Sequence, residues 1–253
     1  MYNDFHIGPI TIHGYGLMIA IGIIAALLLA DYRGKKKGLD TDFIFDLGII
    51  CAIGGFLGAR ILFCIVEFKS MIADPKMFLD VTSGLVVYGG IIGGILTGYL
   101  VCKWKKKHFM SYFDLVMPSI ALAQGFGRIG CFLAGCCYGR ETTSKFGIVF
   151  QNSQFAPNHV ALIPTQLMSS AFDFILAGVL VWYAREQRED GKVAGLYVIF
   201  YSIGRFLIEF LRNDERGSVG ALSTSQFIAI FLLLLGIVLF WNDKIFKRKK
   251  SED

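Results

Sequence analysis

Apolar residues run along this sequence in long stretches, and polar residues gather in the short segments between them. Seven of the apolar stretches are about 20 residues long, the length of an α-helix that crosses the ~30 Å hydrocarbon core of a membrane. They cover about residues 11–31, 43–66, 84–102, 112–135, 163–183, 193–211 and 224–241. The pattern predicts an all-α integral membrane protein with about seven transmembrane helices in one polytopic domain, residues 1–253.

The composition agrees with this pattern. Hydrophobic residues make up 55% of the 253 residues, and 29 glycines come in addition. A soluble domain is usually about 45–50% apolar even with glycine counted. The first ten residues lack a basic segment, so we expect no cleaved signal peptide and expect the first span to direct insertion.

Lysine and arginine predict the orientation of the spans. Sixteen of the 25 basic residues fall in the loops after spans one, three and five and in the C-terminal tail, and six fall in the other loops. Basic loops stay cytoplasmic, so the N-terminus is predicted outside and the C-terminus inside. The net charge of +5 then reflects topology and attraction to anionic lipids, and no nucleic acid partner is expected.

Two of the predicted outer loops, about residues 67–83 and 136–162, are long. The second mixes aromatic, polar and β-branched residues, which favours a small extracytoplasmic loop region. Loops that carry function are often elaborated in this way. The pattern therefore predicts a working face toward the outside.

Three arginines, Arg60, Arg128 and Arg205, lie inside predicted spans. An arginine at the centre of a membrane helix costs about 2.5–3.5 kcal/mol on insertion scales. Each could reach an interface, or form a structural pair such as Arg205 with Glu209 four residues on. All three lie near predicted outer ends, so we expect them to line one outward-facing cavity. The guanidinium group suits phosphate, which favours a phospholipid headgroup as ligand.

Glycines precede Arg60, crowd the third span and surround Arg128, and three cysteines follow Arg128. The glycines are Gly54, Gly55, Gly58, Gly89, Gly90, Gly93, Gly94, Gly125, Gly127, Gly130 and Gly135. They are explained by close helix packing, by backbone approach to a ligand, or by both. Cys131, Cys136 and Cys137 lack the CxxC spacing of zinc sites, so no metal is predicted. They are interpreted as small buried hydrophobes, with a loop disulfide as the alternative.

Three further polar residues lie near the predicted outer ends of spans. Tyr15 and Tyr88 are either interfacial anchors or parts of the site, and their position does not decide between the two. His13 is a candidate general base. Nothing in the chain matches a Walker loop, a dinucleotide fingerprint or a G-x-S-x-G elbow.

Taken together, these residues resemble the bacterial prolipoprotein diacylglyceryl transferases over nearly the whole chain. The motif GRIGCFLAGCCYGR at 127–140 is the most specific part of the resemblance. The other matching motifs are HGYGLM at 13–18, GARI at 58–61, VYGGIIGG at 87–94, PTQL at 164–167 and GRFLIEFLRND at 204–214.

The resemblance implies a reaction and its partners. Such enzymes move the diacylglyceryl group of phosphatidylglycerol to the lipobox cysteine in the signal peptide of a prolipoprotein. A thioether forms and glycerol-1-phosphate leaves, and no cofactor is expected. The implied location is the bacterial cytoplasmic membrane, with an active site that opens toward the outer leaflet.

The resemblance also implies the site residues. Arg128 and Arg205 match the two essential arginines of the family, and Tyr15 matches its first-span tyrosine. We expect these three and Tyr88 to be catalytic. We expect the lipid headgroup to contact Arg128 and Arg205 together with Arg60, Gly139, Glu209 and His13.

Several positions depart from the family pattern. Tyr88 replaces the usual histidine, Cys131 replaces an asparagine, and Cys136 replaces a polar residue. Met168 and Ser169 stand where the family has tyrosine and glutamate. Two alternatives therefore remain: a relative that uses another lipid or acceptor, and a non-catalytic phospholipid-binding membrane protein.

Overall fold

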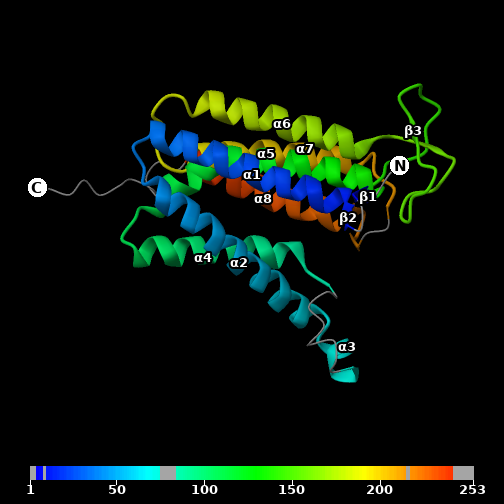
Figure 1. Ribbon diagram of the computed structural model, residues 1–253, viewed down its shortest axis with the longest axis horizontal. Coiled ribbons are helices and arrows are strands. Elements are labelled where there is room, and N and C mark those ends of the chain that lie inside the picture. Colours follow the sequence, from blue (N-terminus) through cyan, green and yellow to red (C-terminus); the bar gives the residue numbers. More distant parts are fainter. Residues whose placement is uncertain (1–3, 8–9, 75–83, 215–216, 242–253) are drawn as a thin grey trace, which may run out of the picture. The chain divides into compact units, whose positions relative to one another are not determined.

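The computed structural model describes residues 4–7, 10–74, 84–214 and 217–241, and each of the seven predicted stretches is helical (Figure 1). The helices are α1 (Gly14–Lys36), α2 (Thr41–Val66), α4 (Val87–Trp104), α5 (Phe109–Ala134), α6 (Thr165–Tyr183), α7 (Lys192–Glu209) and α8 (Thr224–Trp241). Six of them are long and apolar enough to span a membrane. The other, α7, carries Lys192, Arg205 and Glu209 within 18 residues. The prediction of an all-α membrane protein is confirmed, and its orientation stays a prediction.

The first span differs from its predicted bounds at both ends. Strands β1 (Asp4–Ile7) and β2 (Ile10–His13) form an antiparallel hairpin before it. At its other end α1 continues to Lys36, so Arg33 lies in the helix and is only 5% exposed. Arginine and lysine are good helix formers, and positive charge is favourable at a helix C-terminus. The basic segment therefore extends the helix instead of forming the predicted loop.

The chain divides into two compact units, residues 31–112 and residues 1–30 with 113–253, and each is described by itself. A single domain for the whole chain stays a prediction. In the first unit α2 packs along α4 through their glycines. The Asp40 side chain accepts a hydrogen bond from the Phe43 backbone N–H, 3.1 Å away, and so caps α2. That bond and Lys107, whose Nζ lies 3.2 Å from the carboxylate, lower the pKa of Asp40.

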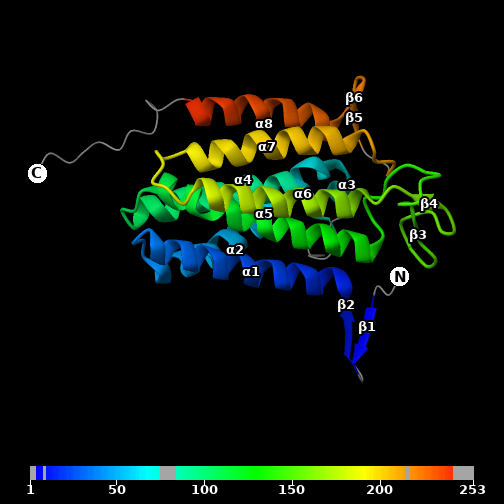
Figure 2. The same ribbon diagram turned by 90° about the horizontal axis from the view of Figure 1, so that it is seen from above.

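The second unit holds α5, α6, α7 and α8. Figure 2 shows α6, α7 and α8 side by side, and α7 contacts both of the others. A buried cluster that includes Met117, Leu180 and Val193 joins α5, α6 and α7. Asp114 on α5 accepts hydrogen bonds of 2.8 Å from the backbone N–H groups of Gly191 and Ala194. These bonds satisfy amide groups that the start of α7 would otherwise leave unpaired.

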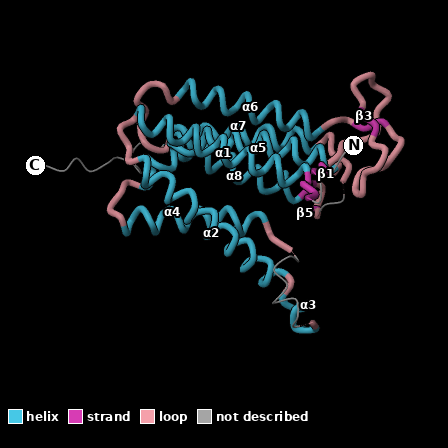
Figure 3. Tube along the Cα trace, in the orientation of Figure 1, coloured by secondary structure: helices cyan, strands magenta, loops and turns pink. Residues whose placement is uncertain are grey.

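Short strands and one short helix complete the described chain (Figure 3). In the loop at 136–162, β3 (Ile148–Val149) pairs with β4 (Ala161–Leu162) beside a small core that contains Phe150. This agrees with the small loop region predicted there. Strands β5 (Ser218–Val219) and β6 (Leu222–Ser223) pair before α8. The loop predicted at 67–83 begins with α3 (Phe68–Ala73), and its residues 75–83 lie outside the described chain.

Candidate active site

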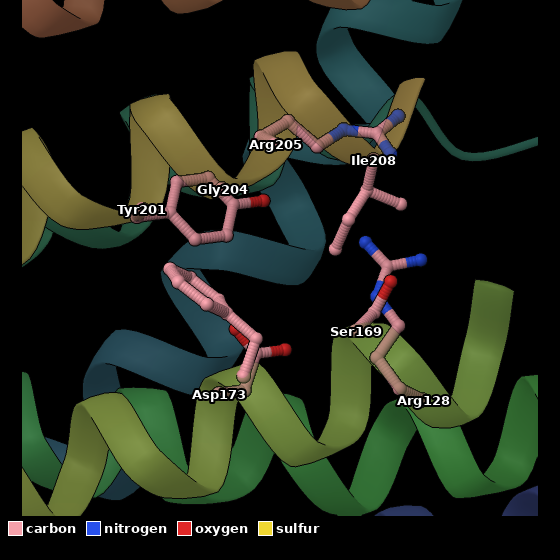
Figure 4. Close-up of a pocket in the computed structure, with 8 residues that line it drawn as sticks. Arg128, Ser169, Asp173, Tyr201, Gly204, Arg205 and Ile208 are labelled. Carbon is pink, nitrogen blue, oxygen red and sulfur yellow. The ribbon is translucent and has the colours of Figure 1, made fainter. Parts of the chain in front are cut away.

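A pocket lies among α5, α6 and α7 in the unit of residues 1–30 and 113–253. We call it the arginine pocket. It is lined by Arg128, Ser169, Phe172, Asp173, Tyr201, Gly204, Arg205 and Ile208. Figure 4 shows the guanidinium groups of Arg128 and Arg205 on the same side of the pocket, with Ile208 between them in this view. The structure thus brings together two of the three arginines that the sequence singled out.

Arg205 is held by neighbouring side chains. Its Nη2 donates a 2.8 Å hydrogen bond to Ser225 Oγ, and its Nη1 lies 3.1 Å from Glu209 Oε2. Glu209 also accepts a 2.7 Å hydrogen bond from Ser223 Oγ and lies 3.8 Å from Arg212 Nη1. The ion pair of Arg205 with Glu209, which the sequence offered as a structural explanation for this arginine, is therefore present. It fixes one side of the guanidinium group on the wall of the pocket.

Arg128 differs from Arg205. It makes no hydrogen bond or ion pair with any residue in the described parts of the chain. Its charge interacts at longer range with Tyr201, Cys131, Cys137 and Asp173. A charged group removed from water is costly unless it is paired. Arg128 is therefore placed to bind an anion that enters the pocket.

Asp173 is a pocket residue that the sequence reasoning missed. It lies in α6, is 3% exposed, and its charge interacts with both Arg128 and Arg205. The sequence does contain a signal for this residue, because the charged Asp173 interrupts the apolar run AFDFIL. Ionisable residues inside spans usually face the protein interior and mark functional sites. Ser169 and Tyr201 in the same lining were also missed.

Tyr15 lies close to the arginine pocket. It is in the first turn of α1, and its ring packs against Gly130, where an added Cβ would lie 3.1 Å from the ring. Its hydroxyl interacts electrostatically with Arg128. His13 lies just before it, at the end of β2, with an exposed side chain. A role for either residue in the reaction stays a prediction.

Arg60 and Tyr88 belong to the unit of residues 31–112. Arg60 Nη1 donates a 3.3 Å hydrogen bond to the Gly84 carbonyl, and the guanidinium lies 5.2 Å from the centre of the Phe63 ring. Tyr88 is in the first turn of α4 and is 38% exposed. The prediction that these residues share a cavity with Arg128 and Arg205 stays a prediction.

Gly139 forms a close backbone contact. It makes an isolated β-bridge with Arg212, and a Cβ at this position would lie 2.8 Å from Ile163 Cβ. Arg212 is held in turn by two hydrogen bonds to Asp214, of 3.0 and 2.7 Å. Gly139 therefore fixes the loop after α5 against the end of α7. Its predicted contact with the lipid headgroup stays a prediction.

The three cysteines of the signature segment lie together. Their sulfur atoms are all within 4.8 Å of one another. Cys136 Sγ donates a 3.7 Å hydrogen bond to the Cys131 carbonyl oxygen. The neighbouring Cys131 and Cys136 thiols lower the pKa of the Cys137 thiol, and the positive charges of Arg212 and Arg128 also lower it. The sequence-based interpretation of these cysteines as small buried hydrophobes did not predict this contact among the three sulfur atoms.

Comparison with known proteins identifies the family. A family model described as prolipoprotein diacylglyceryl transferase matches residues 3–242. The chain belongs to this family. A phosphatidylglycerol–prolipoprotein diacylglyceryl transferase of Clostridium tetani is 51% identical over 96% of this chain and 98% of its own length.

Two diacylglyceryl transferases of Clostridium perfringens are also similar to the chain. The one numbered 2 is 52% identical over 96% of this chain and 95% of its own length. The one numbered 1 is 35% identical over 92% of this chain and 91% of its own length. One species can thus hold two members of this transferase family that differ in their similarity to this chain.

Proposed function

We propose that this protein transfers the diacylglyceryl group of phosphatidylglycerol to the lipobox cysteine of prolipoproteins and releases glycerol-1-phosphate. Membership of the transferase family supports the reaction. The observation that carries it at the level of residues is Arg128, which faces a pocket shared with Arg205 and has no partner in the described chain. Such a cation is suited to an anionic ligand, and a lipid phosphate is one.

In the proposed mechanism the two arginines hold the phosphate of the lipid. The sulfur of the acceptor cysteine attacks the glyceryl carbon next to the phosphate, a C–S bond forms, and the C–O bond to phosphate breaks. The departing oxygen keeps the electron pair, so negative charge grows on glycerol-1-phosphate. Donors that are already in position stabilise such charge without reorganisation. Arg205, held by Glu209 and Ser225, is pre-organised in this sense.

The attacking sulfur must be a thiolate, because the thiol itself is a weak nucleophile. Glu209 is an unsuitable base in this geometry, because it is engaged with Arg205, Arg212 and Ser223. We assign it to the positioning of Arg205. Asp173 is the carboxylate in the lining of the arginine pocket, and we propose it as the group that balances the charge of the two arginines.

The proposal also covers the membrane in which the protein lies and the side to which its pocket opens. A bacterial membrane protein with several spans agrees with the family and with the apolar helices. We propose that it lies in the cytoplasmic membrane and that the arginine pocket opens toward the outer leaflet. The phosphatidylglycerol of that leaflet and the signal peptide of an exported prolipoprotein then meet on one side of the membrane.

The test is transfer in a purified system. The protein in detergent is incubated with phosphatidylglycerol and a lipobox peptide, and the peptide mass is measured. We expect the mass of one diacylglyceryl group to be added to the peptide, and none to a peptide with serine in place of cysteine. If no mass is added under conditions in which a verified enzyme of the family works, the proposal is wrong.

A further inference from the structure

Three thiols meet in the segment that follows Arg128, and two of them interact electrostatically with that arginine. Cys131 is in the last turns of α5, and Cys136 and Cys137 are in the loop that follows. Their sulfur atoms lie within 4.8 Å of one another, and all three cysteines are free and half-buried. The spacing along the sequence does not predict this cluster, because it differs from the CxxC pattern of zinc sites.

An unusual turn assembles the cluster. Gly135 has a φ of 76° and Cys137 a φ of 58°, so the chain reverses through two left-handed residues. A positive φ is uncommon for a residue other than glycine and costs about 1–2 kcal/mol. The reversal brings the Cys136 N–H to 3.1 Å from the Cys131 carbonyl oxygen, and the Cys136 thiol lies 3.7 Å from the same oxygen. The surrounding structure therefore supports a strained backbone at the point where the sulfurs meet.

The first turn of α6 fixes this turn from the other side. Gln166 Nε2 donates a 2.7 Å hydrogen bond to the Cys136 carbonyl, and Thr165 Oγ1 donates one of 2.9 Å to the Cys137 carbonyl. Both side chains are 1% exposed. Gln166 Oε1 has no hydrogen-bond partner among the residues the structure describes. The cluster thus has a rigid support and, next to it, a buried acceptor that is available to a ligand.

Three thiolates are a ligand set for zinc. Sulfurs about 2.3 Å from a tetrahedral zinc ion lie about 3.8 Å apart, so the observed cluster needs to contract by about 1 Å or less. Rotation of the cysteine side chains supplies such a movement. Soft thiolate ligands select zinc or copper(I) over magnesium or calcium. Arg128 and Arg212 interact electrostatically with Cys137 and offset the negative charge of the three thiolates.

We propose that Cys131, Cys136 and Cys137 bind one zinc ion and leave its fourth coordination position open. Zinc sites with three protein ligands and an open position are the catalytic type, whereas structural sites have four ligands. The open position would lie beside Arg128, because Cys131 follows Arg128 by one helical turn and their charges interact. No residue of this chain is needed to fill it.

The open position suits the thiolate of the acceptor cysteine, and this part rests on the proposed function. When the thiol binds zinc, its proton passes to water and the sulfur stays as a thiolate. The bound thiolate then attacks the glyceryl carbon while glycerol-1-phosphate leaves with the electron pair of the broken C–O bond. The thioether product carries no charge and is a weaker ligand, so it dissociates from the zinc.

Zinc content tests the site. The full-length protein, purified in detergent with a reductant and a tag free of histidine, is loaded with zinc chloride and dialysed, and bound zinc is measured by mass spectrometry. We expect about one zinc per chain, and a loss of at least tenfold in affinity for Cys131→Ser, Cys136→Ser and Cys137→Ser. Cys51→Ser and Cys64→Ser are matched controls and should bind as the wild type does. No bound zinc, or equal binding by all five variants, overturns the proposal.

A second measurement uses the wild-type chain, so it does not depend on the folding of a variant. Iodoacetamide labels free thiols, and mass spectrometry of peptides shows which cysteines react. Zinc should slow the labelling of Cys131, Cys136 and Cys137 at least tenfold and leave that of Cys64 unchanged. Equal labelling of the cluster with and without zinc contradicts the site.

Cobalt(II) in place of zinc tests the open position. Addition of a lipobox peptide should raise the sulfur-to-cobalt absorption by about a third, as a fourth thiolate joins three, and the same peptide with serine should not. An unchanged spectrum overturns the open position. The two proposals fail separately: transfer by zinc-free protein refutes the role of zinc in the reaction, and zinc binding without transfer refutes the proposed reaction.

Discussion

Glycine recurs along the α2–α4 pair and again around Arg128 in α5, and the surroundings of the two sets differ. In the pair, a Cβ on Gly58 would meet the carbonyl oxygen of Gly89, and one on Gly93 would lie 2.5 Å from that of Gly54. In α5, a Cβ on Gly127 would find no heavy atom of another segment within 4 Å. Backbone therefore meets backbone in the first region, and an open surface lies next to the arginine in the second.

This difference distinguishes the two explanations of the glycines that the sequence leaves open, close helix packing and backbone approach to a ligand. Small residues let membrane helices approach closely, and the α2–α4 glycines serve that purpose. In α5, Gly125 packs against the Phe174 ring and Gly130 against Tyr15, so these two also serve packing. Gly127 does not serve packing. It directly precedes Arg128, which makes no hydrogen bond or ion pair with the described residues. Substitutions in the two regions should therefore affect different properties.

The largest effect is expected from Arg128→Ala. This change removes a donor to the charge that develops on the phosphate, and loss of one such donor costs about 100- to 1,000-fold in rate. The side chain makes no hydrogen bond or ion pair in the described structure, so the temperature of unfolding should stay unchanged. The rate of transfer to a lipobox peptide and thermal unfolding in detergent check the two statements.

Arg128→Lys is the matched variant, because it keeps the charge and loses the planar fork. A partial recovery of activity is expected, since lysine binds phosphate as a point charge. Normal turnover by Arg128→Ala would remove this residue from the mechanism.

The second-largest effect is expected from Gly89→Ala, which should lower the stability of the protein. The new methyl group would clash with the backbone of Gly58 and lie 2.6 Å from Leu62 Cβ. Overpacking of this kind costs about 1–3 kcal/mol. Thermal unfolding in detergent should show the loss. Gly90→Ala is the matched control one residue along α4, because its methyl group would lie 3.4 Å from the Gly55 carbonyl oxygen, at ordinary contact distance.

A smaller effect is expected from Arg60→Ala. In its own unit this arginine donates to the Gly84 carbonyl and lies over the Phe63 ring. An exposed cation–π contact is worth about 0.5–1 kcal/mol. We expect the transfer rate to fall less than about tenfold, because these contacts already engage the guanidinium group. A loss as large as that of Arg128→Ala would place Arg60 among the groups that bind phosphate.

The helices were predictable because each apolar stretch has to satisfy its own backbone in a membrane. Their ends moved where charged residues continue a helix, as at Arg33. The hairpin of β1 and β2 was not predicted, because the apolar pattern of residues 10–13 continues into the first span. Periodicity alone does not separate a short apolar strand from the start of a helix.

The site was predictable only in part. A charge within a span is visible in the sequence, and this signal found Arg128 and Arg205. Asp173 gives the same signal, but its importance depends on the packing of α6 against α5 and α7, which no local pattern reports. The thiol cluster depends on the left-handed turn at Gly135 and Cys137. Three cysteines with the same spacing on a continuous helix would not meet.

The smallest effect is expected from Gly127→Ala. Alanine is favoured over glycine inside a helix by about 0.5–1 kcal/mol, and the methyl group enters open space, so the unfolding temperature should rise slightly or stay constant. Gly178→Ala in α6 is the matched control, because a Cβ there also meets nothing within 4 Å. If both variants are equally stable and active, the open surface at Gly127 does not contact substrate. If Gly127→Ala alone loses activity at unchanged stability, the lipid passes against the backbone beside Arg128. The glycines of the two regions would then serve helix packing in α2–α4 and ligand approach in α5.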